Sequence, residues 1–195
     1  MGCQTKKTTN LQLSEKVKNY NFPGNSLGLT MSYKYLSNIL RLNWSDLAFA
    51  IENKYLPHEA AIEHAMWELE KDDYHKRTMD LACLDNTEFK QRHSIHPYID
   101  ELARLESEED KSKSKDRIMY AVLRWVFEHR DKYEDPLHVV TFIYSDFGYP
   151  KLISHFITFM PESDVNDKRC LLSRWEDFLN EQNSKYLEDS LEGNK

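Results

Sequence analysis

Residues 135–150 read DPLHVVTFIYSDFGYP, and they contain the clearest helix signals in the chain. Asp135 can cap a helix by accepting from free backbone N–H groups, and Pro136 suits the first turn, where its missing N–H has no intrahelical partner. Gly148 can end the same helix, because glycine readily adopts the left-handed conformation found there. The apolar residues between these signals surround most of the helix, so we expect it to be central.

The rest of the chain has the same helical character. No glycine occurs between Leu29 and Phe147, although strand turns rely on glycine to reach positive φ values. Apolar periodicity predicts helices at residues 33–40, 46–55, 57–72, 76–84, 97–105, 113–131, 136–146, 150–160 and 174–189. Ser173 and Glu176 fit a capping box for the last helix. The core-facing stripe of that helix comprises Trp175, Phe178, Leu179, Gln182 and Tyr186. The sequence therefore predicts an all-α fold of eight or nine short helices, with solenoid-like stacking left open.

The 195 residues are expected to form one domain behind a basic arm. Residues 1–31 are polar and basic without a sustained apolar period, which is typical of a flexible arm. Residues 32–195 are predicted to form a single helical domain. Within it, residues 106–116 read ESEEDKSKSKD, and this charged segment is expected to be a solvated loop or a frayed helix start.

Charge is distributed unevenly along the chain. The formal net charge is −7, but residues 1–44 contain six Lys or Arg residues and only one acidic residue, Glu15. The remaining residues therefore carry a net charge of −12. An acidic body repels phosphates, so we expect no binding of nucleic acid, whereas a basic protein would be steered towards it. Solubility alone is the simpler interpretation of the same charge.

Cysteine usage and apolar run length suggest a cytoplasmic protein. Cys3, Cys83 and Cys170 are widely separated and odd in number, so free thiols are expected rather than a disulfide framework. No run of about 18 apolar residues is present, so no membrane-spanning helix is expected. Lys6 occupies the position where a myristoylation signal has Ser or Thr, which argues against a lipid anchor.

No residue pattern indicates catalysis, a metal or a cofactor. His58 and His64 are six residues apart, about 240° around a helix, so they do not match the spacing of zinc-protease histidines. His93 and His96 with Asp100 form the other possible metal site, but no fourth ligand is near them in sequence. We therefore expect no catalytic residue, no metal and no cofactor.

Trp67 is the residue that best suggests a binding surface. The apolar stripe of helix 57–72 comprises Ala61, Ile62, Ala65, Met66 and Leu69. Trp67 lies about 100° from the centre of that stripe, with Glu63 and Glu70 on its side of the helix. A carboxylate-flanked aromatic side chain suits a basic protein partner, and packing against another helix is the structural alternative. A second candidate surface comprises the acidic residues Glu106, Glu108, Glu109 and Asp110.

Two stretches, residues 42–57 and 133–150, followed by residues 159–161, resemble a known bacterial family. The residues that carry the resemblance include Trp44, Asp135, Pro136, Tyr144, Asp146, Phe147, Tyr149, Pro150, Pro161 and Trp175. The chain is similar to domain-of-unknown-function family 2247 from about residue 42 to residue 182. This resemblance implies a compact bacterial helical protein and supplies no catalytic residues.

These features together predict a non-catalytic binding protein. Small acidic bacterial proteins of this kind resemble immunity partners of secreted toxins, which is an argument by analogy. We expect a cytoplasmic immunity protein that neutralises a cognate, basic toxin domain by occluding its active or substrate-binding surface. A self-associating helical scaffold and an enzyme with a pocket between helices are the alternatives.

Overall fold

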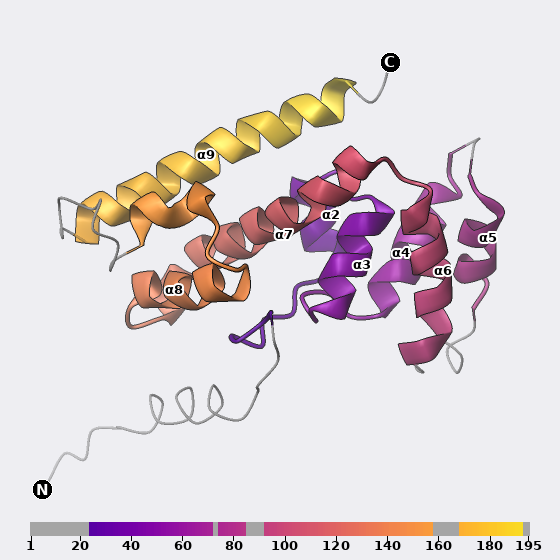
Figure 1. The fold of residues 1–195 in the computed structure, drawn as a ribbon, viewed down its shortest axis with the longest axis horizontal. Helices are drawn as coiled ribbons and strands as arrows, with labels where there is room; N and C mark the ends of the chain where they lie inside the picture. Colours follow the sequence, from indigo (N-terminus) through magenta and orange to yellow (C-terminus); the bar gives the residue numbers. More distant parts are fainter. Residues whose placement is uncertain (1–23, 72–73, 85–91, 158–167, 193–195) are drawn as a thin grey trace, which may run out of the picture.

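The structure, a computed structural model, describes residues 24–71, 74–84, 92–157 and 168–192. In these ranges the protein consists of eight α-helices and two 3₁₀ helices and contains no strand (Figure 1). The elements are α2 (Tyr33–Ile39), α3 (Trp44–Glu52), α4 (Glu59–Glu68), α5 (Lys76–Ala82), α6 (Arg92–Arg104), α7 (Glu108–Glu128), η1 (Arg130–Lys132), α8 (Pro136–Asp146), η2 (Lys151–Phe156) and α9 (Lys168–Glu192). The all-α prediction is confirmed. None of the helices in the described ranges is long and apolar enough to cross a membrane.

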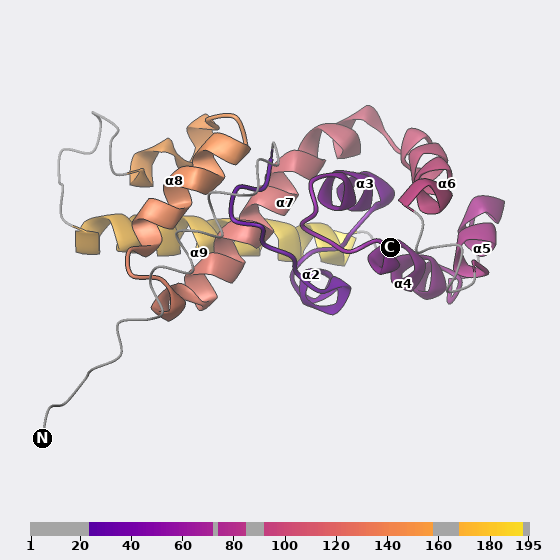
Figure 2. The same cartoon turned by 90° about the horizontal axis from the view of Figure 1, so that it is seen from below.

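Helix α7 passes through the middle of the molecule and connects its two halves (Figures 1 and 2). Helices α2–α6 lie around its first half, and α8, η2 and the start of α9 lie around its second half. Helix α3 packs against both α6 and α7, which are distant in sequence. The helices therefore form one packed body, not a solenoid in which each unit contacts only its neighbours.

The expectation that α8 is central agrees with its buried residues, and α7 also contains many buried residues. The buried apolar residues of α7 are Ile118, Met119, Tyr120, Ala121, Val122, Leu123 and Val126, and those of α8 are Leu137, Val139, Val140, Ile143 and Tyr144. Trp125 and Phe142 are only half-buried, so these two aromatic side chains lie outside the fully buried core.

The end signals of α8 act as the sequence predicts. Asp135 is the N-cap residue and accepts from the His138 N–H at 3.3 Å, and Pro136 occupies the first turn. Gly148 follows the helix with a φ of 71°, a conformation that is strained for residues with a side chain. At the end of the helix, Asp146 accepts from the Ser26 N–H at 2.7 Å. This bond attaches the segment before α2 to α8.

The segment before α2 already belongs to the packed body. Leu29 and Met31 are buried in the core, although the sequence placed them in the flexible arm. Residues 1–23 of that arm lie outside the described residues. The body therefore begins no later than Asn25, whose side chain is buried and bonds to the backbone of Leu29.

Several helix boundaries differ from the prediction. Helix α7 begins at Glu108 after the N-cap residue Ser107, so most of residues 106–116, expected to be a solvated loop or a frayed helix start, lie in the helix. Acidic residues in the first turn of α7 interact favourably with the positive end of the helix dipole and stabilise the helix. This explains how a segment without apolar residues forms a helix. Pro97 lies inside α6, five residues after its start, where it removes one backbone hydrogen bond without ending the helix. The helix expected after Pro150 is the shorter 3₁₀ helix η2.

Helix α9 covers the core with the predicted stripe. Trp175, Phe178, Leu179, Gln182 and Tyr186 are all buried. The Trp175 ring lies 5.1 Å from the ring of Phe127 and 6.3 Å from that of Phe156, between centroids. The helix starts at Lys168, however, so Ser173 lies inside it and is not its cap. The capping-box prediction was therefore wrong.

Candidate functional site

The buried face of α4 is formed by small residues around one histidine. Its buried residues are Ala60, Ala61, His64 and Ala65. Met66, which the apolar stripe predicted to be buried, is 59% exposed. The stripe was misplaced because it omitted His64, which takes a position in the middle of the buried face.

His64 is enclosed by aromatic side chains from three helices. It is completely buried, and its Nδ1 lies 3.0 Å from the hydroxyl oxygen of Tyr33 on α2. The Trp44 ring on α3 meets the imidazole edge to face at 4.7 Å between centroids, and Trp67 on α4 lies 5.3 Å away. Burial, with a smaller effect from Lys71, lowers the pKa of His64 to about 3. The imidazole is therefore neutral at physiological pH.

Glu68 connects this aromatic cluster to the surface. Its carboxylate accepts from the indole N–H of Trp44 at 3.0 Å and lies 3.7 Å from His64 Nε2. The nearby carboxylate favours the imidazole tautomer with the proton on Nε2, so the Tyr33 hydroxyl donates to Nδ1. Burial, followed by the charges of Glu63 and Glu68, raises the pKa of Tyr33 to about 12, which keeps the phenol protonated.

Trp67 lies at the edge of this cluster and is 40% exposed. The ammonium group of Lys71 lies 3.8 Å from the Trp67 ring centroid and 3.5 Å from the Glu68 carboxylate. Trp67 is thus outside the core face, as the sequence indicated. The charge in contact with its ring belongs to Lys71, however, and not to Glu63 or Glu70, which are exposed.

A groove of about 390 Å³ opens beside Trp67, between α2 and the end of α4. Its lining residues are Tyr33, Ser37, Asn38, Ile39, Leu40, Arg41, Leu42, His64, Trp67 and Lys71. Both ionised residues in this lining are cations, Arg41 and Lys71. The lining itself therefore contributes two cations, and the Glu68 carboxylate lies 3.5 Å from one of them, Lys71. We call the lining residues the Trp67 groove.

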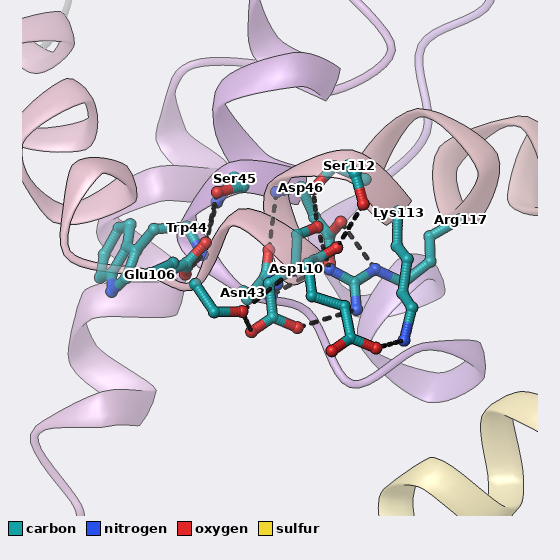
Figure 3. A network of polar contacts seen from close by, with 12 residues as sticks. Asn43, Trp44, Ser45, Asp46, Glu106, Asp110, Ser112, Lys113 and Arg117 are labelled. Carbon is teal, nitrogen blue, oxygen red and sulfur yellow. Dashed lines mark hydrogen bonds and ion pairs between the residues drawn. The ribbon is translucent and has the colours of Figure 1, made fainter.

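The second candidate surface is a network of polar contacts between α3 and the start of α7 (Figure 3). Glu106 accepts from the backbone N–H groups of Trp44 and Ser45, at 2.5 and 2.9 Å, and from the Ser45 hydroxyl. These bonds satisfy free N–H groups at the start of α3. Glu106 therefore acts as a capping residue for α3.

Asp46 and Arg117 form the buried part of this network. Asp46 is fully buried, shares a capping box with Asn43, and accepts from Arg117 Nε at 2.9 Å (Figure 3). Burial raises the pKa of Asp46 to about 6, although Arg117 and the Asn43 N–H favour its charged form. Arg117 also donates to the backbone carbonyl of Asp110 at 3.2 Å. We call Asn43–Asp46, Glu106, Asp110 and Arg117 the α3–α7 network.

The remaining acidic residues of this segment are paired on the surface of α7. Glu108 lies 2.7 Å from Lys111 Nζ, and Glu109 lies 2.6 Å from Lys113 Nζ. Their side chains are 91% and 74% exposed, so these ion pairs contribute little to stability. They do, however, reduce the local negative charge on which the sequence interpretation depended.

A comparison with protein families now gives the chain a classification. A family model described as "Uncharacterized protein conserved in bacteria (DUF2247)" matches residues 33–183. The chain belongs to the DUF2247 family. No curated protein and no solved structure matches it. Both the Trp67 groove and the α3–α7 network lie within the residues that match the DUF2247 model.

The residues that carry the DUF2247 resemblance have mainly structural positions. Trp44 belongs to the α3–α7 network through its backbone, which Glu106 binds, and its indole contacts Glu68 and His64. Tyr144, Phe147 and Trp175 are buried. Asp135, Pro136, Asp146 and Pro150 lie at helix ends, Tyr149 is exposed with a φ of 59°, and Pro161 lies outside the described residues.

The histidines considered as metal ligands do not form a cluster among the described residues. No group of three or more His, Cys, Asp or Glu side chains converges there. The side chain of His93 lies outside the described residues. The ring of His96 packs against that of His58, 6.1 Å apart between centroids, in this DUF2247 structure.

Proposed function

We propose that this DUF2247 protein is a binding protein that neutralises a cognate bacterial toxin by covering its active or substrate-binding surface. The observation that carries the proposal is Trp67, an exposed tryptophan held in place at the edge of a groove. Tryptophan is strongly enriched among the residues that dominate protein interfaces.

The setting of Trp67 supports its role as an anchor. Its ring contacts the buried His64 and the ammonium group of Lys71, and these contacts restrict its motion. A side chain that is already fixed loses less conformational entropy on binding, so more of its contact energy contributes to affinity.

The charge distribution supports a basic partner. Residues 45–195 carry a net charge of −12, and two carboxylates near Trp67 are exposed, Glu63 on α4 and Glu70 just after its end. Opposite charges speed the encounter of two proteins, and salt screens this attraction. A toxin with a basic surface, such as a nuclease, would complement this body.

Co-expression tests the proposal directly. The partner to use is the C-terminal domain of a secreted protein encoded directly upstream of this chain. We expect co-expression to protect the cell, and the purified pair to form a stoichiometric complex without chemical change in the toxin. Protection that requires turnover, or no complex with any neighbouring toxin domain, would contradict the proposal.

Association kinetics test the role of the acidic surface. Glu63→Gln and Glu70→Gln should slow association and weaken its salt dependence while leaving dissociation nearly unchanged, because rim charges act on the encounter. Glu134→Gln, which removes an exposed charge before α8, is the matched control. Equal slowing by all three variants would indicate that only net charge matters.

A further inference from the structure

We propose that the Trp67 groove is a binding site for a small ligand that carries a carboxylate or phosphate group on a planar apolar body. This inference does not depend on a protein partner. It follows from the shape, the charge and the free hydrogen-bonding groups of the groove.

The size and lining of the groove suit a small molecule. Its volume of about 390 Å³ falls within the range of ligand pockets, and its lining is mainly apolar. Ile39, Leu40 and Leu42 from the end of α2 and the following loop supply apolar surface, and Trp67 supplies an aromatic ring. Such a lining favours an apolar body for the ligand.

The charges of the groove favour an anion. Arg41 is exposed and forms no hydrogen bond or ion pair with any residue in the described ranges. Lys71 is 41% exposed, and its contact with Glu68 is long at 3.5 Å, so its ammonium group retains hydrogen-bonding capacity. His64 lines the groove in its neutral form and adds no charge. A carboxylate or phosphate between Arg41 and Lys71 would pair with both cations.

The relative position of Lys71 and Trp67 also fits a ligand in this place. Because Lys71 lies 3.8 Å from the Trp67 ring centroid, an anion bound by Lys71 brings its attached group next to the indole. The charged end and the planar body of one ligand can therefore be held at the same time.

Calorimetric titration with simple probes tests the site. Phenyl phosphate and benzoate carry the two anionic groups on a ring, inorganic phosphate lacks the ring, and benzylamine reverses the charge. We expect phenyl phosphate to bind more tightly than inorganic phosphate, and benzylamine not to bind. The comparison of phenyl phosphate with benzoate shows which anionic group the site prefers. The proposal would be overturned if benzylamine bound more tightly than phenyl phosphate or benzoate. It would also be overturned if neither phenyl phosphate nor benzoate bound.

Variants assign the binding to the groove. Arg41→Gln and Lys71→Gln should each weaken phenyl phosphate binding about tenfold, since each removes one charged hydrogen-bonding partner. Trp67→Leu should weaken phenyl phosphate but leave inorganic phosphate unchanged. Lys34→Gln is the matched control, because Lys34 is an exposed cation on α2 outside the groove lining. Circular dichroism confirms that each variant keeps its fold. Unchanged affinity in Arg41→Gln and Lys71→Gln would place the anion elsewhere and overturn the inference.

Discussion

The Trp67 groove and the α3–α7 network differ in how their charged groups are satisfied. In the network, Asp46 and Arg117 are paired and shielded from solvent, and Glu106 is fully used in capping α3. In the groove, Arg41 has no partner among the described residues, and Trp67 is partly exposed. Charges that satisfy one another hold a fold together, whereas a charge without a partner among the described residues, such as that of Arg41, remains available for a ligand or partner.

The largest expected effect concerns the buried ion pair of the network. Asp46→Asn should lower the free energy of unfolding by about 3 kcal/mol, because it leaves the guanidinium of Arg117 largely unpaired in a buried site. Urea denaturation measures this loss. Asp116→Asn, on the exposed side of α7, is the control and should change stability by less than about 0.5 kcal/mol. Equal losses in the two variants would show that the network is not structural.

The second effect concerns the pH dependence that His64 imposes. The unfolded chain takes up a proton near the ordinary pKa of 6.5, whereas folded His64 does so only near 3. Its contribution to stability is therefore complete above pH 6.5 and is lost as the pH falls towards 3. Between pH 7 and pH 5 the free energy of unfolding of the protein should fall by about 2 kcal/mol more than that of the variant His64→Gln.

Comparison of these two proteins isolates His64 from other titrating groups. Asp46 acts in the opposite direction, because its raised pKa of about 6 lets the folded state bind a proton first. That contribution is present in both proteins and cancels in the difference. Parallel stability curves for the two proteins between pH 7 and pH 5 would show that His64 is protonated in the folded state.

The third effect separates the capping carboxylate from its acidic neighbours. Glu106→Ala should cost about 1 to 2 kcal/mol, because it frees N–H groups at the start of α3. Glu109→Ala, which breaks an exposed pair with Lys113, should cost less than about 0.5 kcal/mol. Thermal unfolding of the two variants gives the comparison. A larger loss in Glu109→Ala would mean that the surface pairs, and not the cap, stabilise this segment.

The smallest effect on stability is expected in the groove. Trp67→Ala should lower the free energy of unfolding by less than about 1 kcal/mol, since it removes one exposed contact with Lys71 and partial packing on His64. Denaturation in urea tests this value. A loss of several kcal/mol would show that Trp67 belongs to the core.

The sequence predicts those helix ends that depend on neighbouring residues. Asp135, Pro136 and Gly148 act locally, and α8 has the predicted bounds. The start of α7 was not predicted, because an apolar pattern cannot reveal a helix stabilised by its cap and by charges in its first turn. Pro97 was misleading for a related reason, since a proline in a helix is tolerated when the surrounding packing offsets one lost bond.

The candidate site was only partly predictable. Helical spacing placed Trp67 away from the core face, because that depends on one helix alone. The cluster of Tyr33, Trp44, His64 and Glu68 comes from three helices, so no local pattern could bring its members together. A histidine among alanines on α4 was the one available signal, and its burial depends on how α4 meets α2 and α3.

The most direct test is the affinity for the toxin domain, measured in two sets of variants. It shows whether the toxin domain binds at the Trp67 groove and not at the acidic segment. With the neighbouring toxin domain as partner, Trp67→Ala should weaken binding by about thirtyfold, the effect of losing an anchor worth about 2 kcal/mol. The double variant Glu108→Gln, Glu109→Gln should weaken it less than about threefold, because both carboxylates are already paired with lysines. The reverse result, with a folded Trp67→Ala at full affinity and a large loss in the double variant, would contradict the account.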